Sequence, residues 1–264
     1  MGTENKRKFA VVTGASSGIG FELAKQCVEH GFDVLICAED LGIDEAAARL
    51  SAADGAIVRP VRADLATRDG CEKLVSEVDR PIDALILNAG VGVGGPFTDT
   101  DLDAELQMIA LNCNHTVHVA KRLLPVMVNR GAGRVLITGS VVSTSPNPYQ
   151  AVYGATKAFV MSLGEALRYE LKDTGVTVTV LQPGATDTNF FERADLMDTK
   201  IGTAKKDDPA LVAKQGFQAM MDGKDSVLGG SFKSRMEGLM NEILPETTKA
   251  AQAGKQTAPG SAKH

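Results

Sequence analysis

The chain has 264 residues, of which 44% are hydrophobic, and its formal net charge is −5 with a pI near 5.5. An acidic chain of this composition offers no basic surface to nucleic acid or to an anionic membrane, so we expect neither as a partner. No apolar run reaches the roughly 18 residues that a membrane span requires, and the polar segment 1–8 does not read as a signal peptide. We therefore expect a soluble, cytoplasmic protein.

The cysteines are too far apart in the sequence to form a Cys-x-x-Cys pair. Most of them fall inside apolar patterns, where a small buried thiol is the usual interpretation. We therefore predict neither disulfides nor a metal site. The cysteines are Cys27, Cys37, Cys71 and Cys113.

Apolar, β-branched segments alternate with helical patterns along most of the chain. Continuous apolar segments are typical of strands covered on both faces, and repeated strand–helix units imply right-handed crossovers. The pattern predicts an α/β fold, a doubly wound parallel sheet of about seven strands with helices on both faces. The predicted strands are 8–13, 33–38, 57–63, 84–88, 134–139, 176–181 and 226–228. The predicted helices are 18–30, 44–53, 67–78, 101–129, 153–173 and 209–221.

Three segments depart from this alternation. The glycine-rich segment 90–95 follows a strand, and we expect a loop at the carboxyl edge of the sheet. Segment 186–208 is long and lacks a clear strand, so we expect it to cover a site as a lid. Segment 246–264 has almost nothing to bury, and we expect a disordered tail after a single domain over residues 1–245.

A glycine-rich turn joins the first strand to the first helix. Gly14 permits a sharp turn, Gly18 lets backbone approach a phosphate, and Gly20 lets the helix pack closely on the strand. A helix N-terminus after such a turn favours an anion, because its N–H groups are unpaired and its macrodipole is positive there. The spacing is G-x-x-x-G-x-G, and on its own it is also compatible with a tight strand–helix connection.

Tyr153 and Lys157 are spaced i, i+4 near the start of a predicted helix, so their side chains share one face. An ammonium group beside a phenol stabilises the phenolate, which would tune the tyrosine for proton exchange with an alcohol or a carbonyl. Ser140 ends a predicted strand and could hydrogen-bond the same substrate oxygen. In isolation this pair is equally compatible with a solvated helix surface, and Asn112 on another helix could bind a ligand or face solvent.

Taken together, these segments resemble the short-chain dehydrogenase/reductase family in order and spacing, from about residue 8 to residue 188. The resemblance implies an oxidoreductase with Tyr153 as general acid/base and Lys157 lowering the pKa of Tyr153 and holding the nicotinamide ribose. It implies that Ser140 orients the substrate oxygen and that Asn112 holds a water in a proton relay. The matching segments are Thr13–Gly20, Asn88–Gly90, Asn112, Ser140, Tyr153–Lys157 and Pro183–Gly184.

The resemblance also implies a set of cofactor-binding residues. Asn88–Gly90 would lie beside the adenosine ribose with Asp64 near the adenine, and segment 183–188 would grip the carboxamide and the pyrophosphate. The implied set is Gly14, Ser16, Ser17, Gly18, Ile19, Gly20, Glu39, Asp64, Leu65, Asn88, Ala89, Gly90, Tyr153, Lys157, Pro183, Gly184, Thr186 and Thr188.

The end of the second strand bears on the choice between NAD and NADP. An acidic residue there accepts hydrogen bonds from a ribose 2′-OH and repels a 2′-phosphate, whereas an arginine does the reverse. Glu39 stands where NADP-preferring relatives usually carry arginine, and Ser17 stands where they often carry a basic residue. The sequence therefore favours NAD over NADP. The alternative is that Glu39 begins a solvated turn while Arg62 reaches over the site.

The segments expected to line the substrate pocket are mostly apolar, which indicates an apolar ketone or secondary alcohol. Arg193 would bind a carboxylate if the lid folds inward, or would lie on the surface. The competing hypothesis is a catalytically silent, cofactor-binding regulator or scaffold. The expected pocket residues are Val142, Pro146, Tyr149, Phe190 and Phe191, together with the loop 91–97.

The predicted helices 101–129 and 153–173 carry more apolar positions than packing on one sheet face requires. The family resemblance implies homotetramers or homodimers packed through these two helices. We therefore expect a homo-oligomer with two-fold symmetry.

Overall fold

In the computed structural model, which describes residues 7–51, 55–231 and 245–263, seven parallel strands form one sheet. The strands are β1 (Lys8–Thr13), β2 (Phe32–Ala38), β3 (Val58–Arg62), β4 (Ala84–Leu87), β5 (Gly133–Thr138), β6 (Val176–Pro183) and β7 (Ser226–Gly229). Their order is β3-β2-β1-β4-β5-β6-β7. Successive strands are added toward one edge of the sheet from β1 to β3 and toward the other edge from β4 onward. The strand order therefore reverses between β1 and β4, the position at which doubly wound sheets bind ligands. The predicted fold class is confirmed.

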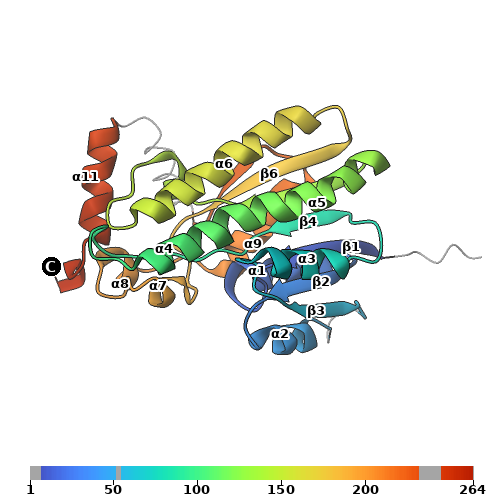
Figure 1. The fold of residues 1–264 in the computed structure, drawn as a ribbon, viewed down its shortest axis with the longest axis horizontal. Helices are drawn as coiled ribbons and strands as arrows, with labels where there is room; N and C mark the ends of the chain where they lie inside the picture. Colours follow the sequence, from blue (N-terminus) through green and yellow to red (C-terminus); the bar gives the residue numbers. More distant parts are fainter. Residues whose placement is uncertain (1–6, 52–54, 232–244, 264) are drawn as a thin grey trace, which may run out of the picture.

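Helices cover both faces of the sheet. Residues of α1, α2 and α9 pack on one face, and residues of α3, α5 and α6 pack on the other. Figure 1 shows α4 and α5 in line with one another and α6 running beside them along the molecule. The helices are α1 (Gly18–Glu29), α2 (Gly42–Ser51), α3 (Arg68–Ser76), α4 (Leu102–Ile109), α5 (His115–Arg130), α6 (Ala151–Leu171), α7 (Phe190–Arg193), α8 (Lys200–Thr203), α9 (Pro209–Met221) and α11 (Glu246–Thr257).

The two cores are built from alternate residues of the same strands. Ala10 and Val12 of β1 belong to the core beneath α1 and α9, whereas Phe9 and Val11 belong to the core beneath α3 and α5. Successive strand side chains point to opposite faces, so a strand covered on both sides must be apolar throughout. This is why the central strands appear in the sequence as continuous apolar runs.

The predicted helix 101–129 is three elements in the structure. A π-helical turn, Ala110–Asn114, separates α4 from α5 without ending the helical path. Such wide turns insert an extra residue and often occur at functional sites. Here the turn contains Asn112, which is buried.

The segment expected to form a lid contains the short helices α7 and α8. Its two ends are joined by a parallel bridge between Thr186 and Asp207. Phe191, Ala194 and Leu196 form a small apolar core of its own. The segment is therefore a folded unit beside the sheet.

The predicted disordered tail is wrong for the described part of segment 246–264. Residues Glu246–Thr257 form α11, followed by the short turn Ser261–Lys263. The segment binds through polar and small groups: Thr257 Oγ1 donates to the Pro148 carbonyl at 2.7 Å, and Gly260 N donates to Asp198 Oδ2 at 2.7 Å. Its composition gave no apolar signal because it docks by hydrogen bonds. Figure 1 shows α11 beside α7 and α8 at one end of the molecule.

Within residues 7–51, 55–231 and 245–263, no helix is long and apolar enough to cross a membrane. The same residues contain no cluster of side chains suited to a metal ion. All four cysteines are buried free thiols.

Candidate active site

The turn between β1 and α1 forms one end of a pocket at the carboxyl edge of the sheet. Gly18 has a φ of +57°, a left-handed conformation that L side chains rarely adopt, and a Cβ there would also press on the Thr188 side chain of the lid segment. A Cβ on Gly20 would collide with the Gly14 carbonyl. The Ser17 side chain makes no capping bond to the first turn of α1 in the described structure. The leading N–H groups of this helix therefore remain available to an anion.

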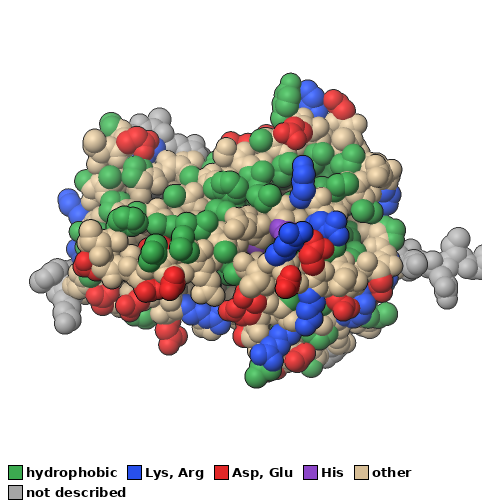
Figure 2. All heavy atoms as spheres, in the orientation of Figure 1, with side chains coloured by type: hydrophobic (Ala, Val, Ile, Leu, Met, Phe, Trp, Pro, Cys, Tyr) green, Lys and Arg blue, Asp and Glu red, His purple; other side chains and the backbone are tan. Residues whose placement is uncertain are grey.

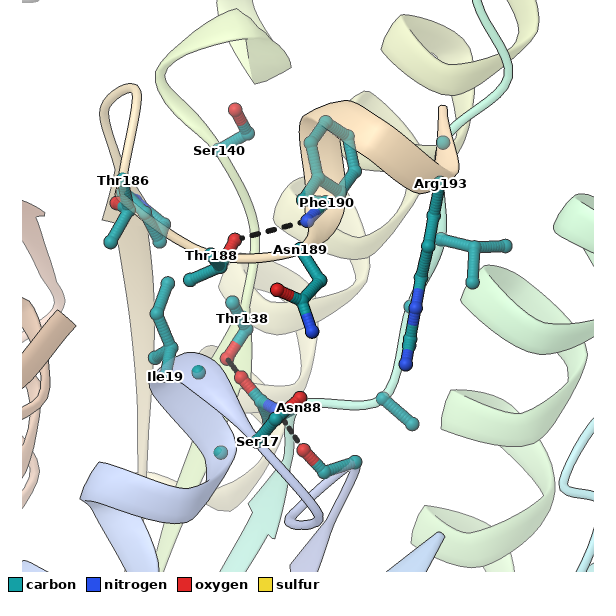
Figure 3. A pocket seen from close by; sticks show the side chains of 18 of the residues that line it. Ser17, Ile19, Asn88, Thr138, Ser140, Thr186, Thr188, Asn189, Phe190 and Arg193 are labelled. Atoms are coloured by element: carbon teal, nitrogen blue, oxygen red, sulfur yellow. Dashed lines mark hydrogen bonds between the residues drawn. The ribbon is translucent and has the colours of Figure 1, made fainter. Parts of the chain in front are cut away.

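Asn88 ties three strand ends together behind this turn. Its Nδ2 donates to the Thr13 carbonyl at 3.1 Å and to the Gly14 carbonyl at 3.2 Å. Its Oδ1 accepts from Thr138 Oγ1 at 3.1 Å, a bond visible in Figure 3. Asn88 therefore fixes the glycine turn to β4 and β5, and a ligand at the turn meets a rigid backbone.

Tyr153, Lys157 and Ser140 meet at the other end of the pocket. Tyr153 and Lys157 project from the first turns of α6 and are only 9% and 6% exposed. Lys157 Nζ donates to the Thr138 carbonyl at 3.0 Å and lies 5.7 Å from the centroid of the Tyr153 ring. The Ser140 side chain is hydrogen-bonded to Tyr153. The pair is thus buried, and the alternative of a solvated helix surface is excluded.

Burial controls the protonation of this cluster, because it disfavours the charged form of every group. Burial raises the pKa of Tyr153 to about 12, against the opposing effect of its hydrogen bond to Ser140. Burial also lowers the pKa of Lys157 to about 8. Lys157 is not among the groups that shift the pKa of Tyr153 here, so the expected lowering of that pKa by Lys157 stays a prediction. At neutral pH the site holds a protonated phenol, which is a proton donor.

Asn112 does not line the pocket. Its Nδ2 donates to the Val91 carbonyl at 3.0 Å and to Thr156 Oγ1 at 3.0 Å, and its Oδ1 accepts from Val91 N at 2.9 Å. Its amide thus joins the loop after β4 to α6, one residue before Lys157. Asn112 is 2% exposed, so the structure excludes the solvent-facing alternative, and its amide holds the segment next to Lys157.

Most of the other sequence-predicted residues line the same pocket. Asp64 does not: its Oδ1 accepts from Ala66 N at 2.9 Å, within its own loop. Pro146 and Tyr149 also lie outside the lining. The predicted residues that line the pocket are Gly14, Ser16, Ser17, Gly18, Ile19, Gly20, Glu39, Leu65, Asn88, Ala89, Gly90, Val142, Pro183, Gly184, Thr186, Thr188, Phe190, Phe191 and Arg193.

The end of β2 brings together acidic and basic groups. Ser16 Oγ donates to Asp40 Oδ2 at 2.7 Å, and Asp40 Oδ1 accepts from Gly42 N at 2.9 Å. Glu39 is exposed and lines the pocket. Arg62 Nε donates to the Glu39 carbonyl at 3.0 Å, so an arginine does lie beside this turn.

Two pocket residues received little or no weight from the sequence. Arg193 extends from α7 along one wall of the pocket in Figure 3. Gln150 immediately precedes α6 and also lines the pocket. The available signal for Gln150 was its position one turn before Tyr153, since it belongs to no motif.

A family model for short chain dehydrogenases matches residues 8–198. The chain belongs to the short-chain dehydrogenase family. It is 32% identical over 221 residues to an uncharacterized oxidoreductase of Staphylococcus saprophyticus, covering 82% of this chain and 92% of that protein.

Solved structures share the fold of this short-chain dehydrogenase over almost its whole length. One is a short-chain dehydrogenase from Sphingobium yanoikuyae in complex with NADPH, with a TM-score of 0.79 and 28% identity over 90% of this chain and 96% of that one. Another is a bulky-bulky ketone specific alcohol dehydrogenase from Comamonas testosteroni, with a TM-score of 0.76 and 25% identity over 91% and 96% of the two chains. The family assigns the chain to the oxidoreductases, and its neighbours support a nicotinamide cofactor.

Proposed function

We propose that this protein is an NAD(P)-dependent oxidoreductase that interconverts a ketone and a secondary alcohol, with Tyr153 as general acid/base. The observation that carries the proposal is one pocket with an anion-binding helix N-terminus at one end and the buried cluster of Ser140, Tyr153 and Lys157 at the other. Family membership and the ketone-specific neighbour support the same reaction class.

The residues present fit a dinucleotide. The bare backbone at Gly14 and Gly18 and the free N–H groups of α1 suit its pyrophosphate, and segment 183–188 lines the pocket opposite. Lys157 lies where it could hold the nicotinamide ribose. When bound, the nicotinamide supplies or accepts the hydride, and the protein contributes position and proton transfer.

Separate side chains of this protein orient the substrate oxygen, transfer the proton and stabilise the phenolate. In reduction, Ser140 donates a hydrogen bond to the carbonyl oxygen of the substrate, and the Tyr153 hydroxyl gives that oxygen its proton. In oxidation, Tyr153 takes the alcohol proton back. Lys157, charged below its pKa of about 8, stabilises negative charge on the phenolate oxygen. Asn112 keeps the loop after β4 and the first turns of α6 in register.

We propose NAD as the preferred cofactor. The support is the acidic end of β2, where Glu39 lines the pocket and Asp40 is held by Ser16. The opposing observation is Arg62 beside the Glu39 backbone. Parallel titrations with NADH and NADPH test the proposal, because a ligand that binds only the folded state raises its melting temperature. A larger shift and a higher kcat/KM with NADPH would overturn it.

The reaction itself is tested by turnover of a panel of ketones with the preferred reduced cofactor. The pocket end near Tyr153 is lined by apolar side chains including Val142, Phe190 and Phe191, so we expect apolar ketones to be accepted. Cofactor binding without turnover of any ketone would refute an oxidoreductase and favour the silent scaffold. Absence of cofactor binding would refute both.

We also propose a homodimer or homotetramer. Figure 2 shows hydrophobic side chains gathered in a band across the face of α4, α5 and α6. Such a contiguous apolar band on a protein surface marks an interaction site. The exposed apolar residues of these helices are Leu102, Leu106, Ile109, Val117, Val126, Phe159 and Tyr169.

A further inference from the structure

One polar side chain of the pocket has no assigned task. Gln150 is 6% exposed, and its Oε1 accepts a hydrogen bond from Asn147 Nδ2 at 3.3 Å. Its Nε2 is buried and has no hydrogen-bond partner in the part of the chain that the structure describes. Ser140, Tyr153 and Lys157 in the same pocket all have partners. Gln150 is therefore the one of these four pocket-lining residues with an unpaired buried polar atom.

An unpaired buried amide is unfavourable, because it has lost its hydrogen bond to water without gaining one in the protein. Folded proteins retain few such groups, and each calls for a physical explanation. A ligand that supplies the missing acceptor is one explanation, and it applies here because Gln150 lines the pocket that contains Tyr153. Gln150 immediately precedes α6 and stands three positions before Tyr153, and both residues line the same pocket.

The backbone around Gln150 is held from several sides. Gly95 N donates to the Tyr149 carbonyl at 2.8 Å, and Thr257 Oγ1 of α11 donates to the Pro148 carbonyl at 2.7 Å. Tyr149 itself has a φ of +59°, a strained conformation that persists only where surrounding contacts impose it. Gln150 is therefore presented on a fixed segment, as preorganised recognition requires.

We propose that Gln150 Nε2 donates a hydrogen bond to a second oxygen of the substrate, a few bonds from the carbonyl that Tyr153 protonates. The substrate is then an oxygenated ketone, such as a β-keto ester, and not a simple hydrocarbon ketone. A neutral amide donor suits a neutral carbonyl or hydroxyl oxygen, whereas a carboxylate is usually bound by arginine or lysine. This inference rests on the proposed function and names the substrate class of the same site.

The test compares two ketones of equal chain length, ethyl acetoacetate and methyl pentyl ketone, in wild type and Gln150→Leu. Loss of one neutral hydrogen bond should lower kcat/KM for the keto ester by about threefold to tenfold. The hydrocarbon ketone should change by less than twofold. Because each ketone is compared with itself across variants, the greater intrinsic reactivity of the ester cancels. Gln218→Leu, on the exposed side of α9, is the matched control and should change neither value.

Melting temperature provides the second measurement. Gln150→Leu removes an unpaired buried donor but also the acceptor of Asn147 Nδ2, and these two effects oppose one another, so its melting temperature should stay close to that of wild type. An equal loss of kcat/KM on both ketones, or a melting temperature lowered by several degrees, would overturn the role of Gln150. If wild type turns over neither of these ketones and no other ketone of the panel, the proposed function fails. The Gln150 proposal is then tested by the melting temperature at saturating ethyl acetoacetate and at saturating methyl pentyl ketone. In wild type the keto ester should raise the melting temperature more than the hydrocarbon ketone does. This difference should disappear in Gln150→Leu, and a difference that persists would overturn the proposal.

Discussion

Replacing Lys157 with methionine should make the protein more stable while removing its activity. The ordinary pKa of a lysine, 10.5, falls to about 8 at this buried position. Each pKa unit corresponds to about 1.4 kcal/mol, so the folded state bears a cost of about 3 kcal/mol for keeping the ammonium charged at neutral pH. The substitution also loses the hydrogen bond to the Thr138 carbonyl, worth about 1 kcal/mol. The expected net gain in the free energy of unfolding is about 2 kcal/mol at pH 7.

The gain should depend on pH with a defined sign. Between pH 8 and 10.5 the unfolded chain binds the Lys157 proton and the folded chain has released it, so wild-type stability rises with pH in that window. The methionine variant lacks this titration. Its advantage should therefore be full below pH 8 and should shrink as the pH rises toward 10.5.

Urea unfolding of both proteins at pH 7 and pH 9.5 measures the effect directly. The control is Lys214→Met, which replaces an exposed lysine on α9. It should change the free energy of unfolding by no more than about 0.5 kcal/mol. A variant that is destabilised at pH 7, or whose advantage grows at pH 9.5, would refute the reasoning that the Lys157 ammonium is held at a cost.

Three further outcomes follow from the same site and surface. Tyr153→Phe should lower kcat by about 10²–10⁴-fold while leaving the cofactor-induced thermal shift intact; a smaller loss would mean that the proton comes from another group. The kcat/KM for ketone reduction should be flat below pH 8 and fall above it as Lys157 loses its proton, whereas a profile flat to pH 10 would exclude a role for its charge. Leu106→Glu, at a position 53% exposed on α4, should reduce the molar mass measured by light scattering, and an unchanged mass would argue against this face as the interface.

The sheet could be predicted from the sequence because its strands obey one physical requirement. Each central strand packs on both faces, so most of its residues are apolar, and the apolar run 9–12 predicts β1 for that reason. The glycine turn and the Tyr153–Lys157 pair were also visible, since a positive φ and an i, i+4 spacing are local properties. Such local requirements restrict the residue types at neighbouring positions, so they can be recognised in the sequence.

Properties that depend on contacts between distant segments of the chain could not be recognised in the sequence in this way. The sign of the Tyr153 pKa shift depends on how completely the pocket walls exclude water, and the effect of burial exceeds the opposing effect of the Ser140 hydrogen bond. Gln150 Nε2 is unpaired because none of the segments that fold around it offers an acceptor in the described structure, and the neighbouring sequence does not reveal this. The α11 helix docks through Thr257 and other polar groups, and composition alone does not distinguish such a helix from a disordered segment.

The position of α11 relates this helix to the substrate end of the pocket. The family model ends at residue 198, and the cofactor end of the pocket lies entirely within it. Lys249 of α11, which is buried, donates to the Thr144 carbonyl at 3.2 Å. Thr144 ends the short helix capped by Ser140, so the loop between Ser140 and Gln150 is braced by a segment outside the family match. Substrate selectivity should therefore respond to changes in α11 that leave cofactor binding untouched, because the helix braces the loop between Ser140 and Gln150.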